Sequence, residues 1–333
     1  MPENSIKLVN GRYEVGLPWR YPKPYLPNNR VVAEKRLNQL KKRFQRDDNL
    51  FQLYRDVIYD YISKGYGRKV TEEPDNTVDQ TCKVTSDSDN SSLQLNQSPP
   101  QHSQSEADGA DEAYVETIKW YLPHQPVLHL RKPGRVRVVF DCASRYKGTC
   151  MNDQLLHGPD YTNNLIRVLS RFRRDSVAFI ADVEAMFHQV RVPENHSNVL
   201  RFLWWPGDNL SMPPVDYQMM VHLFGATSSP SCVSFALKQT AKDNRESFSE
   251  EAARTVNESF YVDGCLKSVQ TKEQAVALVK ELRALLHRGG VRLTKWVSNS
   301  REVLETVPEG ERAHTVVNLY LDNLPIEHTL GVR

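Results

Sequence analysis

Two aspartates, Asp182 and Asp263, each follow a short apolar run and are the side chains best placed for chemistry. Residues 176–181 have the length and apolar character of a buried strand, which ends at Asp182. Residues 260–262 precede Asp263 and Gly264, and an Asp-Gly pair between two strand-like runs predicts a β-hairpin with a two-residue type I′ turn. A carboxylate at such a tip is well placed to bind a metal ion at the edge of a sheet.

Each aspartate also has an ordinary structural interpretation. Asp-Gly is the strongest short hairpin signal, so Asp263 alone is typical of a surface turn. An aspartate at the end of a buried strand, such as Asp182, is often a helix cap or a structural acid. Neither residue alone establishes a catalytic site.

The surrounding pattern predicts a mixture of helices and strands. Amphipathic spacing from Asn28 to Gly65 predicts two helices separated at Asp47-Asp48, and further helices are predicted at 161–173, after Pro230 and at 271–288. The predicted strands are residues 137–141, 176–182, 200–205, 215–219, 260–266 and 291–296.

Composition restricts the class of protein. The chain has 333 residues, of which 39% are hydrophobic and 25% charged, which is ordinary for a globular protein with two or three subdomains. No apolar run approaches the roughly 18 residues of a membrane helix, and the N-terminus lacks a signal-peptide core. Five cysteines without C-x-x-C spacing argue against a zinc site and a disulfide framework. We therefore expect an intracellular protein, cytoplasmic or nuclear, that is not secreted.

The net charge of +2 hides a strong asymmetry. Residues 1–70 carry 15 Lys and Arg against 7 Asp and Glu, whereas residues 71–118 carry one Lys against 11 acids. The polar, low-complexity stretch 71–113 is predicted to be disordered. The basic parts permit a polyanionic partner, although a basic helix surface such as that at 35–46 is also typical of a solvated face.

A second basic cluster surrounds the predicted turn at Pro133-Gly134. Lys132, Arg135 and Arg137 belong to it, and Arg137 begins a predicted strand. Such a hairpin is suited to bind phosphate groups. A solubilising turn explains the same residues equally well.

Six sequence blocks, taken in order, resemble the reverse transcriptase region of BEL/Pao-type LTR retrotransposon polyproteins. They are residues 134–142, 152–159, 181–190, 224–230, 260–263 and 290–300. The resemblance covers residues 119–310, and residues 11–70 also resemble the segment before the polymerase core in this group. The acidic stretch 71–113 has no counterpart and is interpreted as an insertion.

The resemblance implies an α+β fold with reverse-transcriptase-like fingers and palm, an antiparallel palm sheet with packed helices, and an incomplete thumb. The implied divisions are an N-terminal arm and basic helix (1–70), an acidic insertion (71–113), the fingers and palm (114–310) and a truncated start of the connection region (311–333). The chain therefore resembles a fragment of a polyprotein.

The resemblance also implies a site. Asp182 and Asp263 would hold two Mg²⁺ or Mn²⁺ ions, roughly 3.5–4 Å apart, for nucleotidyl transfer. Lys295 loosely matches the lysine that protonates the pyrophosphate leaving group. The remaining matches are residues expected to contact the incoming dNTP: Lys132, Arg135 and Arg137 on its triphosphate, Val183 beside Asp182, Phe187 under the sugar, and Gly225 at the template–nucleotide pair.

One departure affects this expectation. The family pattern at the hairpin is Tyr-x-Asp-Asp, and here the second aspartate is Gly264, so one metal ligand is missing. Glu184 lies two residues from Asp182 but is usual for the group. We therefore expect an RNA-directed DNA polymerase domain, acting on an RNA or DNA template–primer, whose activity is weak or absent. The alternatives are a silent nucleic-acid-binding relic or domesticated protein, and a structural or interaction protein.

Overall fold

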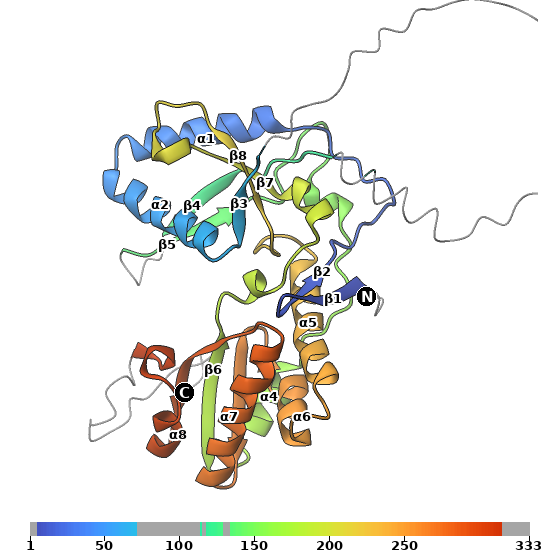
Figure 1. Ribbon diagram of the computed structural model, residues 1–333, viewed down its shortest axis with the longest axis vertical. Helices are drawn as coiled ribbons and strands as arrows, with labels where there is room; N and C mark the ends of the chain where they lie inside the picture. Colours follow the sequence, from blue (N-terminus) through green and yellow to red (C-terminus); the bar gives the residue numbers. More distant parts are fainter. Residues whose placement is uncertain (1–4, 72–113, 115–117, 129–133, 315–333) are drawn as a thin grey trace, which may run out of the picture.

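The computed structural model describes residues 5–71, 114, 118–128 and 134–314, which fold into two lobes. Each lobe has its own hydrophobic core, and the two lobes are stacked along the long axis of the molecule (Figure 1). The predicted disordered stretch from residue 72 onward, Lys132 and residues 315–333 lie outside the described residues.

The lower lobe in Figure 1 contains a four-stranded antiparallel sheet in the order β11-β6-β10-β9. Its strands are β6 (Val177–Val183), β9 (Phe260–Tyr261), β10 (Gly264–Val269) and β11 (Leu293–Ser298). Its helices are α4 (Leu165–Phe172), α5 (Ser229–Asp243), α6 (Glu250–Glu258), α7 (Lys272–Arg288) and α8 (Arg301–Glu305). The prediction of an α+β fold with an antiparallel sheet and packed helices is confirmed.

Alternation along β6 determines which side chains enter the core. Phe179, Ala181 and Val183 are buried against the helices, whereas Ile180 and Asp182 on the other face are only partly buried. Successive side chains of a strand point to opposite faces, so a carboxylate at position 182 is directed away from the core.

Helix α7 covers the buried face of this sheet. Its apolar side chains recur at the i, i+3, i+4 and i+7 spacing of one helix face. The buried ones are Ala275, Leu278, Val279, Leu282, Leu285 and Leu286. A capping box begins the helix, in which Thr271 and Gln274 satisfy each other's backbone N–H groups, and such a cap is typically worth about 1 kcal/mol.

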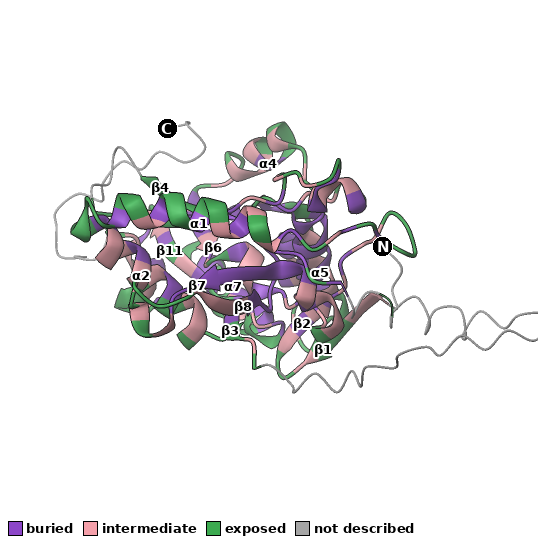
Figure 2. Ribbon diagram, turned by 90° about the horizontal axis from the view of Figure 1, so that it is seen from above, coloured by how far each residue is buried: buried purple, intermediate pink, exposed green. Residues whose placement is uncertain are grey.

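The upper lobe combines helices α1 (Arg30–Phe44) and α2 (Asp48–Ser63) with two small sheets. The first sheet has the order β3-β8-β7, and β4 pairs with β5 in the second. Their bounds are β3 (Gly67–Lys69), β4 (His124–Leu128), β5 (Val136–Phe140), β7 (Arg201–Trp204) and β8 (Val215–Met219). Figure 2 shows α1 along the outer surface, with buried and exposed residues alternating around it.

The first 70 residues contribute to both cores. Leu37 and Tyr54 pack with Trp204 and other residues in the upper core. The hairpin of β1 (Ile6–Val9) and β2 (Arg12–Val15) instead packs on the lower core through Tyr13 and Val15. Short 3₁₀ helices connect other elements: Met151–Gln154, Met186–Gln189, Glu194–Leu200, Pro206–Asp208 and Glu309–Glu311.

The predicted type I′ turn at Asp263-Gly264 is wrong. Gly264 pairs with Tyr261, so the two turn residues are Val262 and Asp263, and Gly264 is the first residue of β10. Val262 has a φ of 54°, whereas neither Asp263 nor Gly264 has a positive φ. A β-branched residue in the left-handed region is an uncommon and strained conformation, so sequence alone favoured the glycine.

Candidate active site at the end of the antiparallel sheet

Asp182 and Asp263 lie at the same end of the sheet, on neighbouring strands. Asp182 is opposite Gly264 of β10 on one side and opposite Thr294 of β11 on the other. The backbone N–H of Val183 donates a hydrogen bond of 2.7 Å to the carbonyl oxygen of Asp263. The antiparallel pairing of β6 with the β9–β10 hairpin therefore places the backbones of the two predicted aspartates side by side.

Gly264 has room for a side chain. A Cβ atom built there would lie 3.5 Å from Leu266 Cδ1 and 3.7 Å from the Tyr261 carbonyl oxygen, which are ordinary contacts. Its backbone does not require glycine either, because its φ is not positive. Position 264 is buried, but a Cβ atom fits there and the backbone does not require glycine.

Lys295 lies against Asp182. Its Nζ donates to Asp182 Oδ2 at 2.6 Å, with side-chain exposures of 65% for the lysine and 34% for the aspartate. The register of β11 on β6 shifts between Thr294 and Val297, and Lys295 within this bulge has a φ of 54°. Bulges redirect side chains, and here the redirected ammonium lies on the predicted metal ligand.

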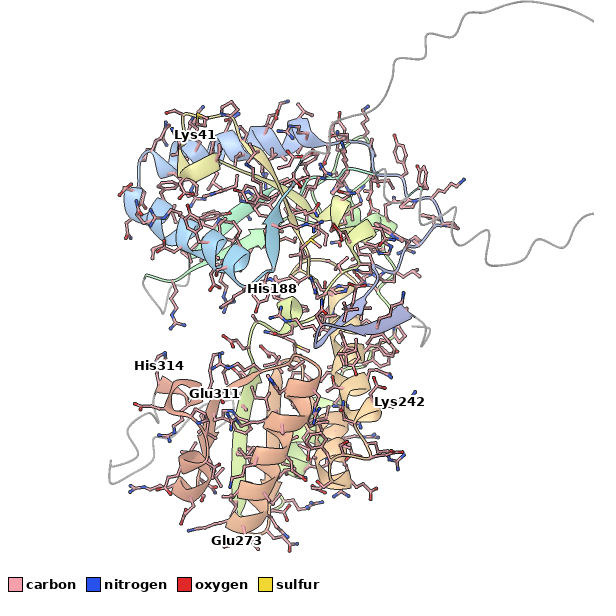
Figure 3. All side chains as sticks on the ribbon, in the orientation of Figure 1. Lys41, His188, Lys242, Glu273, Glu311 and His314 are labelled. Carbon is pink, nitrogen blue, oxygen red and sulfur yellow. The ribbon has the colours of Figure 1, made fainter. Side chains whose placement is uncertain are left out.

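Glu184 is also paired with a basic side chain of the adjacent segment. Arg292 Nη1 lies 3.1 Å from Glu184 Oε2, and Arg292 Nε lies 3.2 Å from Glu311 Oε1. Glu311, labelled in Figure 3, also pairs with Arg283 at 2.9 Å. The role of Arg292 was missed from sequence. The feature that indicates this role is an acidic segment, 182–184, that pairs with a basic segment, 292–295, in the antiparallel sheet.

The donor set does not match a pair of divalent cations. No group of three or more His, Cys, Asp or Glu side chains that could hold a metal occurs among the described residues. Asp182 is ion-paired with Lys295, and Glu184 is ion-paired with Arg292. Among the described residues, the expected two-metal site thus has Asp182 and Asp263 but no third candidate ligand grouped with them.

Phe187 and Gly225, both predicted near the nucleotide, lie close to one another in the structure. Phe187 packs partly against the lower core and makes an edge-on contact with Phe224, with ring centroids 5.8 Å apart. Phe224 is 65% exposed. Gly225 has a φ of 107°, and a Cβ atom there would lie 3.1 Å from the Phe140 carbonyl oxygen, so its backbone needs glycine.

Asn152 holds the loop that contains Gly225. Its amide nitrogen donates to the Gly225 carbonyl oxygen at 3.0 Å, and its amide oxygen accepts from the Thr227 N–H at 3.0 Å. His157 Nδ1 lies 2.6 Å from the Thr227 hydroxyl. Neither Asn152 nor Thr227 has a role assigned from the sequence, and the structure shows that Asn152, in block 152–159, positions the loop of block 224–230.

The basic hairpin lies on the upper lobe. Arg137 of β5 is exposed, and its strand packs on α2, while Arg135 just precedes the strand and is also exposed. Within the described part of the chain, no hydrogen bond or ion pair links either arginine to Asp182, Asp263 or Lys295. The structure therefore pairs Lys295 with Asp182, places Asp263 on the neighbouring strand, and places the arginines on the other lobe.

His188 connects the two lobes beside Phe187. Its ring contacts Tyr61 and Tyr66 of the upper lobe, with centroids 4.9 and 5.1 Å away, and Figure 3 shows it at the junction. Burial, together with the charge of Lys64, lowers the pKa of His188 to about 4. A neutral imidazole thus packs between the two parts.

Comparisons with known proteins give matches among solved structures alone. No protein-family model matches the chain, and a search of curated proteins finds no match. Among solved structures, the foamy viral protease–reverse transcriptase in complex with double-stranded DNA matches with a TM-score of 0.46 and 14% identity, over 73% of this chain and 30% of that one. A prototype foamy virus protease–reverse transcriptase CSH mutant matches with a TM-score of 0.40 and 16% identity, over 57% and 23%. This chain thus spans less than a third of either structure.

In the described residues, no helix is both long and apolar enough to cross a bilayer.

Proposed function

We propose that the chain is a reverse-transcriptase-like polymerase core of the BEL/Pao type that binds a primer–template and has weak or no nucleotidyl transfer activity. The observation that carries this proposal is the position of Gly264, directly opposite Asp182 and next to Asp263 in the same sheet. A carboxylate at this position would complete an acidic cluster. Its absence leaves two aspartates from neighbouring strands.

The supporting geometry is the convergence of residues that are distant in sequence. Asp182, Asp263 and Lys295 come from three successive parts of the sheet and meet at one end of it. Phe187, which follows β6 closely, packs beside Phe224 at the start of the Gly225 loop. This grouping agrees with a site that handles a deoxynucleotide, in which Phe187 excludes a 2′-hydroxyl and Gly225 lies at the base pair.

Nucleic-acid binding is assigned to exposed cations of the upper lobe. Arg135 and Arg137 lie on the hairpin, and α1 presents an exposed face with Lys35, Lys42 and Arg43. The final turn of α1 is basic, and its first turn contains no acid. Clusters of this kind bind phosphate groups with a steep dependence on salt.

With four buried free cysteines among the described residues, we place this function in the reducing cytoplasm or nucleus.

The second candidate function is nucleic-acid binding without catalysis. It is favoured by two ion pairs, Asp182 of β6 with Lys295, and Glu184, directly after β6, with Arg292. In this case the fold presents a surface that binds nucleic acid, and the carboxylates stabilise the fold through their ion pairs.

Primer extension distinguishes the two candidates. Wild type and Gly264→Asp are assayed on a primed RNA template with dNTPs and Mg²⁺ or Mn²⁺, beside Gly264→Ala as a control that adds a side chain but no carboxylate. The polymerase proposal predicts synthesis by Gly264→Asp and little or none by the other two. If Gly264→Asp binds the primer–template yet extends nothing, the silent binder is the better description.

A further inference from the structure

Both acids at the end of β6 are neutralised from the same neighbouring segment. Lys295 Nζ lies 2.6 Å from Asp182, and Arg292 Nη1 lies 3.1 Å from Glu184. Asp263 forms no ion pair with another described residue. We propose that Lys295 and Arg292 provide the positive charge that divalent cations would otherwise supply here, so that this end of the sheet is stable without metal and binds metal weakly. This inference rests on the proposed polymerase origin of the site.

The strand register explains how the charges meet. Leu293 pairs with Val183, and the backbone N–H of Glu184 donates to the Arg292 carbonyl oxygen at 2.9 Å. Arg292 is thereby placed directly beside Glu184. Its guanidinium also reaches Glu311, which Arg283 holds from α7, so Arg292 is kept in position from two sides.

Lys295 reaches Asp182 because of the bulge. In regular pairing, the residue next to Thr294 would point to the opposite face from its neighbour, since the side-chain period of a strand is two. The register shift and the φ of 54° at Lys295 change that direction and place the ammonium on Asp182. A non-glycine residue with positive φ is strained and persists only where its surroundings impose it.

The sizes of two effects decide what controls metal binding. The Lys295–Asp182 pair is largely exposed, and an exposed ion pair changes a binding constant by about fivefold at most. The carboxylate missing at Gly264 is a direct ligand, and its return should improve binding by about tenfold or more. The glycine at 264 is therefore the larger cause of weak metal binding, and the ammonium of Lys295 is the smaller cause. A variant that gains the carboxylate at 264 and loses the ammonium at 295 should bind metal most tightly.

The test measures Mn²⁺ binding to the full chain by electron paramagnetic resonance, without nucleic acid or dNTP. The variants are Lys295→Met, Lys295→Arg, Gly264→Asp and the double variant Gly264→Asp/Lys295→Met. Lys272→Met is the matched control, because Lys272 forms an ion pair of 2.5 Å with Glu302 in the same lobe and is similarly exposed. Circular dichroism and thermal melting establish that each variant is folded.

We expect Lys295→Met to bind Mn²⁺ more tightly than wild type by up to about fivefold, Gly264→Asp by about tenfold or more, and the double variant most tightly. Lys295→Arg should behave as wild type because it keeps the charge. Equal binding by wild type and Lys295→Met overturns the inference, as does an equal gain in Lys272→Met, which would show only a general charge effect. Primer–template affinity, measured on the same wild-type sample, tests the proposed function separately. If wild type does not bind the primer–template but the variants rank by Mn²⁺ affinity as expected, the proposed nucleic-acid binding is refuted and the inference about charge is not.

Discussion

Gly264 lies directly opposite Asp182 in the antiparallel pairing of β10 with β6. Neither its backbone angle nor the space around it requires a glycine. Position 264 is therefore one where a Cβ atom fits beside Asp182 and Asp263 on a backbone that any residue can adopt. The proposed impairment of activity rests on this position.

Gly264→Asp should fold and should be slightly less stable than wild type in the absence of divalent cations. Like charges on adjacent strands repel each other, which we expect to lower the Tm by about 1–3 °C. Mn²⁺ should restore the loss in this variant and not in Gly264→Ala. Differential scanning calorimetry with and without Mn²⁺ provides the check, and a fall in Tm of more than about 10 °C would refute the claim that the site has room.

Val262→Gly should stabilise the protein. Val262 is 47% exposed and has a φ of 54°, so little packing is lost while strain in the turn is relieved. The gain should be about 1 kcal/mol, since left-handed conformations cost L-residues about this amount. Urea unfolding measures it, and Val262→Ala, which keeps a Cβ atom, is the control and should gain less. A less stable Val262→Gly would show that this turn is not strained.

The stability of the protein should fall as the pH drops below about 6.5. Burial lowers the pKa of His124, His188, His196 and His222 to about 4. Between pH 6.5 and about 4 the unfolded chain binds protons that the folded chain does not, so stability is fully present above this window and is lost within it.

His188→Phe isolates one of these contributions. The ring packs between Tyr61 and Tyr66, so phenylalanine can keep the contacts while removing the titration. The Tm of the variant should decrease less steeply than that of wild type from pH 7 to about 4.5. Parallel curves would show that His188 does not titrate in this window.

Arg135→Ala/Arg137→Ala should weaken primer–template binding. Both side chains are exposed on the β4–β5 hairpin. The slope of log K against log salt should decrease by about two if each arginine contacts one phosphate. Fluorescence anisotropy at several salt concentrations measures this slope. Lys272→Ala/Lys280→Ala, two exposed lysines on α7 in the lower lobe, is the control for total charge. An equal decrease of the slope in this control would contradict a specific role of the hairpin in binding.

The regular elements could be predicted from the sequence because their patterns are local. A helix is predicted over 271–288, and the structure has α7 at Lys272–Arg288. The apolar run before Asp182 likewise forms β6. Local patterns fix the type of element, since side-chain burial follows its period.

The details of the site could not be predicted because they depend on register. Asp-Gly indicates a type I′ turn, yet the pairing of Tyr261 with Gly264 moves the turn to Val262 and Asp263. The contact of Lys295 with Asp182 depends on a bulge, and that of Arg292 with Glu184 depends on the alignment of β11 with β6. A shift of one residue in register reverses every side chain, and single-sequence patterns do not specify it.

Primer extension by Gly264→Asp beside wild type tests the central claim most directly. The claim is that the fold and the two remaining aspartates are those of a polymerase, and that Gly264 disables it. We expect the Gly264→Asp protein to incorporate dNTPs on a primed RNA template at least about 100-fold faster than wild type, a rate change equivalent to about 2.7 kcal/mol. Equal extension by the two proteins would contradict the claim.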